Sequence, residues 1–435
     1  MKKEADKYGD MGIGHGEGTG DIGRIRGISL AKQTFRSFKH PVFRLYFGAM
    51  LGQQASMNMQ MMARSLLIYR MTGSATILGA MSLANALPML SFSLFGGVIA
   101  DRVQKKYVIL AGQAVSAVVA LGIALSLTLG YLSAERAGSW WILIVASVLQ
   151  GTIMALMMPS RQAMLPEIVG DEQLMNAVSL NMLGMNALRL FAPALTGFLI
   201  DAIGFGAVYY TMTGMYLMAV VFMAFMPVTS TMTLRGGGAL ADIKLGLNYI
   251  RHEAIILLIL VFTLVAVILS MPYMMLMPIF ADDILKVGAT GMGVLLSVSG
   301  IGAMVGSLIL ASLPNRKRGL MLLGSGIILG LALAGFSFSS SWPLSLALIV
   351  LVGLGQTGRM TLGNTLLQYY VEDDYRGRVM SIYMMEFGLM SFGAFTAGVL
   401  TEVMGPQLAL GGFAIMLVFL SIMALVFVPR LRRLE

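Results

Sequence analysis

Long apolar stretches alternate with short charged segments along most of the chain. Twelve stretches are each long enough to cross the hydrocarbon core of a membrane, which takes about 20 helical residues. They are apolar throughout, whereas a strand of a membrane barrel alternates polar and apolar positions, so we predict helices. The predicted spans are 43–69, 75–100, 107–132, 140–159, 174–200, 206–228, 254–281, 290–313, 320–339, 343–370, 377–402 and 407–428.

The composition agrees with a membrane protein and excludes several kinds of chemistry. Hydrophobic residues make up 57% of the chain, charged residues 12%, and the mean hydropathy is +0.82. The chain has no cysteine, and its three histidines lie outside the predicted spans, so we expect no disulfide and no metal site. Since no nucleotide-binding motif appears either, we predict a protein that is no enzyme and carries no cofactor.

The basic residues predict the orientation. With an even number of spans both termini lie on one side, and that side receives 24 of the 30 lysines and arginines, if Arg161 is counted in a loop. The opposite side receives Arg70, Arg136 and Lys286. Both termini are therefore predicted to be cytoplasmic, and the net charge of +9 reflects membrane topology rather than nucleic-acid binding.

The chain also repeats itself. The segment 169–179 is similar to 371–381, and Gly197 to Asp201 with Gly204 is similar to Gly398 to Glu402 with Gly405. Two six-helix pseudo-repeats around a central path suit rocking alternating access. The predicted parts are a cytoplasmic tail with an interfacial stretch (1–40), an N-terminal half (41–228), a linker (229–252), a C-terminal half (253–428) and a C-terminal tail (429–435).

A charged segment separates the second and third predicted spans. It reads Gly-Gly-Val-Ile-Ala-Asp-Arg-Val-Gln-Lys-Lys from Gly96 to Lys106. It resembles the loop signature of the major facilitator superfamily of transporters. The resemblance implies a cytoplasmic latch between the halves, in which Asp101 meets the start of the eleventh span. The latch residues it implies are Gly97, Asp101, Arg102, Lys105, Arg376 and Arg378.

Further short motifs resemble one bacterial branch of this superfamily, that of enterobactin exporters and macrolide efflux pumps. The similarity runs over nearly all of residues 40–428. It implies an all-α, twelve-helix membrane protein that exports small molecules. The motifs are Arg44 to Gly48, Thr72-Gly73-Ser74, Ala86-Leu87-Pro88, Pro159-Ser160-Arg161, Leu165-Pro166-Glu167 and Arg376 to Val379.

The fifth span adds a sign of export. Ala192 to Gly197 resembles the glycine-proline motif of the superfamily's antiporters, with Ala192 where glycine is usual. Pro193 frees a backbone carbonyl, and Gly197 permits close helix contact. The alternative is an ordinary packing kink.

Charged residues inside spans are costly and indicate function. Arg64, Arg189, Arg359 and Glu386 are the candidates. Polar residues at helical spacing accompany them, and we predict that these line the cavity between the halves; for the arginines the alternative is snorkelling or a structural ion pair. The predicted cavity residues are Gln53, Met57, Gln60, Arg64, Asn186, Arg189, Thr361, Asn364, Gln368 and Tyr383.

Glu386 is the acid placed well inside a span, so it is predicted to carry a proton during transport. Its alternative role is a packing pair with an arginine. Proton-coupled relatives often have an arginine three residues before Gln-Gly in the fourth span, but Ser147 stands there in this chain. Proton coupling is therefore inferred from the resemblance and from Glu386.

These observations predict a secondary transporter that exports an amphipathic small molecule by proton antiport, as a monomer in the bilayer of the bacterial cytoplasmic membrane. A uniporter or lysolipid-type translocator that needs no proton is one alternative. A membrane sensor or scaffold without transport is another. The chain's 38 methionines suit a binder of varied ligands, or else simply fill apolar space.

Overall fold

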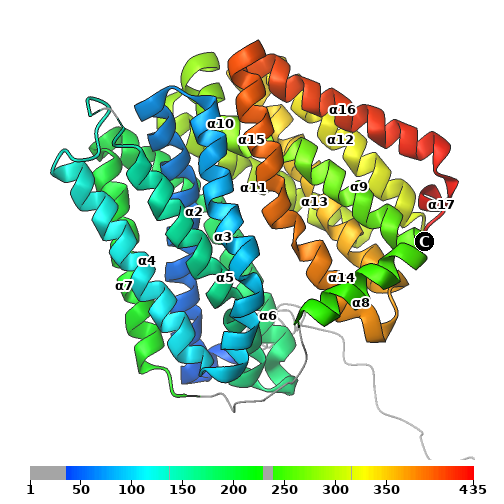
Figure 1. Ribbon diagram of the computed structural model, residues 1–435, viewed down its shortest axis with the longest axis horizontal. Helices are drawn as coiled ribbons and strands as arrows, with labels where there is room; N and C mark the ends of the chain where they lie inside the picture. The colour runs from blue at the N-terminus through cyan, green and yellow to red at the C-terminus, as the bar shows by residue number, and fades with distance from the viewer. Residues whose placement is uncertain (1–35, 137, 229–238, 315) are drawn as a thin grey trace, which may run out of the picture.

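A computed structural model describes residues 36–136, 138–228, 239–314 and 316–435, which contain helices and no strand. Two groups of helices lie side by side (Figure 1). After a short 3₁₀ turn, Arg36–Lys39, the N-terminal group is α2 (Pro41–Thr72), α3 (Ala75–Arg102), α4 (Lys105–Thr128), α5 (Trp141–Val169), α6 (Asp171–Ile203) and α7 (Phe205–Phe225).

The amphipathic part of the predicted linker forms α8 (Ala239–His252), which packs on α14. The C-terminal group is α9 (Ala254–Ser270), α10 (Pro272–Ile279), a π-helical turn (Phe280–Ile284), α11 (Gly288–Ser312), α12 (Arg318–Phe338), α13 (Trp342–Tyr370), α14 (Asp373–Met384), α15 (Glu386–Met404) and α16 (Pro406–Phe427), followed by the short α17 (Pro429–Arg432).

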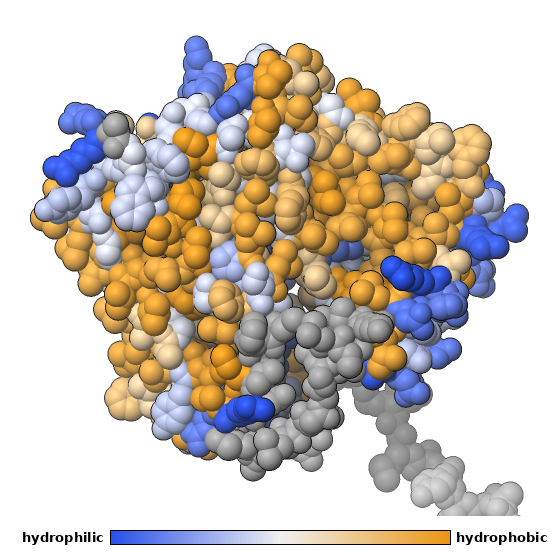
Figure 2. All heavy atoms as spheres, viewed as in Figure 1, coloured by the Kyte–Doolittle hydropathy of each residue, from blue (hydrophilic) through white to orange (hydrophobic). Residues whose placement is uncertain are grey.

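Eleven helical segments of the described chain are long and apolar enough to cross a membrane. The helix α2 is long enough, but its middle carries Gln53, Gln54, Asn58, Gln60 and Arg64. Hydrophobic residues cover most of the face shown in Figure 2, and hydrophilic residues gather toward its margins. The chain is therefore a multi-pass, all-α membrane protein, and the count of twelve spans stays a prediction.

Two predicted spans are interrupted in the structure. The seventh continues to Ile284 but breaks at Met271, because Pro272 has no backbone N–H to continue the helical hydrogen bonding. The eleventh breaks at Met385, between α14 and α15. Both interruptions lie in the C-terminal group. The second one makes Glu386 the first residue of a helix.

The helix of the fourth predicted span is longer than the prediction. The helix α5 runs on from residue 159 to Val169 through Pro159 and Pro166, and ends at Gly170, whose φ of 66° favours glycine. Arg161 is therefore a helical residue rather than a loop residue, and it is partly buried. The two prolines therefore do not end this helix.

Two helix pairs join the groups, α3 with α15 and α6 with α11. The helix ends at the top of Figure 1, where α2 is followed by α3 and α15 by α16, are called the far end from here on. At the far end the two groups approach each other, and away from it they diverge (Figure 1).

Candidate functional site

Glu386 lies in a buried polar cluster inside the C-terminal group. It is the first residue of α15, directly after the break at Met385. Its Oε2 lies 3.7 Å from Nη1 of Arg359 on α13, and its Oε1 accepts a 2.6 Å hydrogen bond from Thr263 on α9. Glu386 is 6% exposed and Arg359 is 3% exposed. Three helices thus meet at one ion pair.

The hydrogen bonding in this cluster is incomplete. Nε of Arg359 is buried and makes no hydrogen bond to a described residue, and its Nη1 reaches the carbonyl oxygen of Thr263 at 3.5 Å. Tyr383, one turn before Glu386, donates its hydroxyl to the carbonyl oxygen of Met360 at 3.4 Å. At a separation of 3.7 Å the carboxylate compensates the buried guanidinium only in part, so the charge state of Glu386 affects the stability of the whole cluster.

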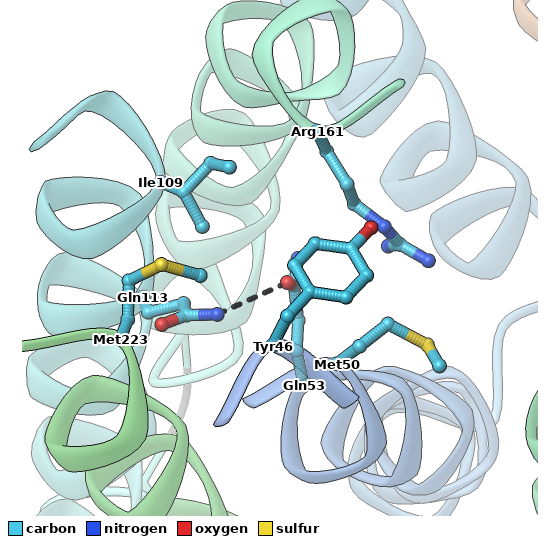
Figure 3. A pocket seen from close by; sticks show the side chains of 7 residues that line it. All are labelled: Tyr46, Met50, Gln53, Ile109, Gln113, Arg161 and Met223. Atoms are coloured by element: carbon cyan, nitrogen blue, oxygen red, sulfur yellow. Dashed lines mark hydrogen bonds between the residues drawn. The ribbon is translucent and has the colours of Figure 1, made fainter. Parts of the chain in front are cut away.

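The polar stripe of α2 faces the interior of the N-terminal group at Gln53. The Gln53 Oε1 accepts a 3.3 Å hydrogen bond from Nε2 of Gln113 on α4, and its Nε2 lies 3.6 Å from the sulfur of Met157 on α5 (Figure 3). Gln60 is buried as well, and Met57 is partly exposed. For this stripe the role in an inter-half cavity stays a prediction.

Arg64 lies on the same stripe and has no acidic partner among the described residues. Its Nε and Nη1 are buried without a hydrogen bond, while the residue as a whole is partly exposed. The phenol groups of Tyr209 and Tyr216 on α7 lie within electrostatic range of its guanidinium. Arg64 and Arg359 thus differ in their surroundings, because only Arg359 is paired with a carboxylate.

The sequence did not single out Arg161 or Gln113 for the site. Arg161 points into a narrow pocket between α2, α4, α5 and α7, together with Tyr46 and Gln113 (Figure 3). Its Nη2 donates to Oε1 of Gln54 at 3.3 Å. The helical period places Arg161 and Met157 on one face of α5, and this signal becomes visible once α5 extends past Pro159.

The other predicted cavity residues lie in several places. Asn186 and Arg189 on α6 are exposed. Thr361 lines a cleft between α11, α12 and α13, and Asn364 accepts a 2.5 Å hydrogen bond from Gln368 one turn later. Their contact with a shared path remains a prediction.

Three of the six members of the predicted latch contact a residue of their own group. Lys105 forms an ion pair with Glu167 on α5, Arg376 lies 2.6 Å from Asp373, and the guanidinium of Arg378 lies over the ring of Tyr375. Arg102 is exposed. The surroundings of Gly97 and the side chain of Asp101 are not among the parts of the chain that the structure describes, so the latch itself stays a prediction.

At the far end, two acids from different groups cap two helices in equivalent ways. Asp201 of α6 accepts a 2.7 Å hydrogen bond from the backbone N–H of Thr290, in the first turn of α11. Glu402 of α15 accepts a 3.0 Å hydrogen bond from the backbone N–H of Thr76, in the first turn of α3, and another from the Ser74 hydroxyl. Each acid thus joins one group to the other, and a carboxylate at a helix N-terminus is stabilising.

One turn before each acid, a glycine brings the same two helices together. A Cβ on Gly197 would lie 2.2 Å from the carbonyl oxygen of Ala289, and one on Gly398 would lie 2.4 Å from that of Ala75. The repeat found in the sequence pairs Gly197 with Gly398, and Asp201 with Glu402. The two inter-group contacts are therefore copies of one another.

Two further polar contacts close the far end. Arg70 at the end of α2 pairs with Asp282 in the π-helical turn, through Nε at 2.7 Å and Nη2 at 3.0 Å. Its neighbour Tyr69 donates to Asp283. We call these contacts and the two acid caps the far-end seal, whose members are Tyr69, Arg70, Ser74, Thr76, Asp201, Asp282, Asp283, Thr290 and Glu402.

Comparisons with known proteins agree with this architecture. The chain is 26% identical to a multidrug efflux pump of Mycolicibacterium fortuitum, over 85% of this chain and 91% of the pump. It is 25% identical to an enterobactin exporter of Shigella boydii, over 91% of this chain and 93% of the exporter. The crystal structure of a peptide transporter, POT, in complex with sulfate superposes with a TM-score of 0.70 at 14% identity, over 91% of this chain and 95% of that one, and so shares the fold. A family model described as transmembrane secretion effector matches residues 32–435, and the chain therefore belongs to this family of the major facilitator superfamily.

Proposed function

We propose that this protein exports an amphipathic small molecule from the cytoplasm, driven by protons that move in the opposite direction. The relatives named above are an efflux pump and an exporter, and each is matched over most of its length. The proposal includes the bacterial cytoplasmic membrane, with both termini in the cytoplasm, because 24 of the 30 basic residues belong to that side in the predicted topology. The far end then faces the outside.

The observation that carries the proposal is the buried Glu386 beside Arg359 and Thr263. When Glu386 is ionised, it accepts from Thr263 and attracts Arg359. When it takes up a proton, the attraction to Arg359 ends and the carboxyl group becomes a donor. Since α15 begins at Glu386, right after a break in the span, this change acts at a point where the helix direction is not fixed by continuous hydrogen bonding.

Alternating access follows from the arrangement at the far end. The far-end seal holds the two groups together there, which supports an inward-facing state. To release substrate outside, the seal must break and the opposite end must close. We propose that the predicted latch of Asp101 with the start of α14 forms in that second state, so the two sets of contacts exclude each other.

Efflux from intact bacteria tests the proposal. Cells that produce the protein are loaded with a panel of hydrophobic drugs or with enterobactin, and the loss of each compound is followed with and without a protonophore. Export of at least one compound that stops with the protonophore is expected. Export that is insensitive to the protonophore and to external pH favours a uniporter. No export of any compound from this broad panel, with the protein present in the membrane, contradicts the proposed function.

A further inference from the structure

Arg64 has two buried guanidinium nitrogens, Nε and Nη1, and the proton mechanism does not use this arginine. None of the six predicted spans of the N-terminal half contains an aspartate or a glutamate, so no carboxylate inside that half is available to it. An unpaired charge inside a membrane protein is expensive and is retained for a function. In the same chain, Arg359 does have a carboxylate beside it. The missing anion thus distinguishes Arg64 from Arg359.

The surroundings of Arg64 offer donors. Its own Nε and Nη1 are buried without a hydrogen bond, and so is the hydroxyl group of Tyr209 on α7. The hydroxyl group of Tyr216, also on α7, lies beside Gln150 and Ser116, and both phenol groups lie within electrostatic range of Arg64. These two tyrosines are 0% and 2% exposed. Gln60 is buried one turn before Arg64 on α2. The guanidinium of Arg64 is thus surrounded by neutral hydrogen-bond donors. One cation with several neutral donors is an environment that suits an anion.

A row of polar side chains leads from the other end of α2 toward Arg64. Arg161 and Gln53 line the pocket of Figure 3, and Gln53 lies 11 residues before Arg64, about 16 Å along the helix. Like Arg64, Arg161 forms no ion pair with a described residue. Both ends of the row are thus positively charged, and a negatively charged molecule is favoured along its whole length.

We propose that the exported substrate is an amphipathic anion and that Arg64 binds its charged group. A planar guanidinium pairs best with two oxygens held in one plane, so the group is a carboxylate or a similar planar oxyanion. The apolar part of the substrate lies against the apolar and methionine side chains around the row. This inference rests on the proposed export function and adds the chemical class of the substrate.

Two dyes with one ring system and opposite charge test the inference, the anion fluorescein and the cation rhodamine 123. Binding is measured by fluorescence polarisation with the purified full-length protein in detergent, with empty micelles as the blank. Wild type is expected to bind fluorescein, and Arg64→Gln to weaken this binding roughly 10- to 100-fold, the range for a hydrogen bond to a charged group. Arg64→Lys should restore part of the affinity, and rhodamine 123 binding should be the same in all three proteins.

Arg136→Gln is the matched control, because Arg136 is an exposed arginine in the loop before α5. Unchanged fluorescein binding in Arg64→Gln overturns the inference, as does an equal loss of both dyes or no fluorescein binding by wild type. Efflux of the dyes from proteoliposomes tests the export proposal separately from the anion site. Fluorescein that binds but is not moved contradicts export, and rhodamine 123 that is moved while fluorescein is not bound contradicts the anion site.

Discussion

Removal of the two capping acids is expected to open the far end. Asp201 and Glu402 each accept from a backbone N–H in the first turn of a helix of the opposite group. The double variant Asp201→Ala, Glu402→Ala leaves both helix ends without this acceptor when the far end is closed. In the open state the two acids of the wild type face water and cap no helix of the opposite group, so their removal acts on the closed state alone.

The size of the effect follows from capping energies. A side chain that caps a helix stabilises it by about 0.5 to 2 kcal/mol. Because both carboxylates are solvent-exposed, we take about 1 kcal/mol for each cap. The two sites belong to different helix pairs and are expected to be additive. Together they give about 2 kcal/mol, which shifts the ratio of closed to open far ends roughly 30-fold.

Double electron–electron resonance measures that ratio. The chain has no native cysteine, so a spin label on one cysteine in each group, near the far end, reports the distance between the groups directly. Glu135→Ala, an exposed acid in the loop after α4, is the control and should leave the distances unchanged. Identical distance distributions for the double variant and for wild type refute the assignment of these acids to a seal.

Three further predictions concern the rest of the transport cycle. In Gly197→Val, even the Cβ would lie 2.2 Å from the Ala289 carbonyl oxygen, so the two helices must separate. The same spin labels should report an open far end, and transport should fall; a closed far end contradicts the tight contact. Asp101→Asn should remove the predicted latch, favour the inward-facing form and slow transport, with labels at the opposite end as the measure; an unchanged open-to-closed ratio eliminates the latch. Single cysteines at Gln60, Asn186 and Arg189 should react with a small water-soluble thiol reagent and be protected by substrate, and positions that never react do not face the path.

The sequence predicted most of the helices and the two charged residues of the buried cluster, because long apolar runs and rare charges inside them are strong signals in a membrane protein. Glu386 and Arg359 were both singled out, and their pairing was among the alternatives. Thr263 was not, because a threonine in an apolar span usually bonds its own helix and gives no sign of a distant partner.

The far-end acids show what the repeat signal contains beyond the fold. Asp201 and Glu402 occupy equivalent positions in the repeat, and an Ala-Thr pair lies in the first turn of both α3 and α11, at Ala75 and Ala289. The sequence thus held all four partners. Their contact could not be predicted, because it depends on which helices of the two groups face each other, and that is decided by packing over the whole bundle.

Proton-driven transport by the Glu386→Gln variant in proteoliposomes tests the central claim most directly. The amide imitates the protonated acid, so the variant should bind substrate and exchange it across the membrane without a gradient. A pH gradient should drive accumulation in wild type and have no effect on the variant. Accumulation by Glu386→Gln that follows the pH gradient as in wild type contradicts the claim that this carboxylate couples protons to export.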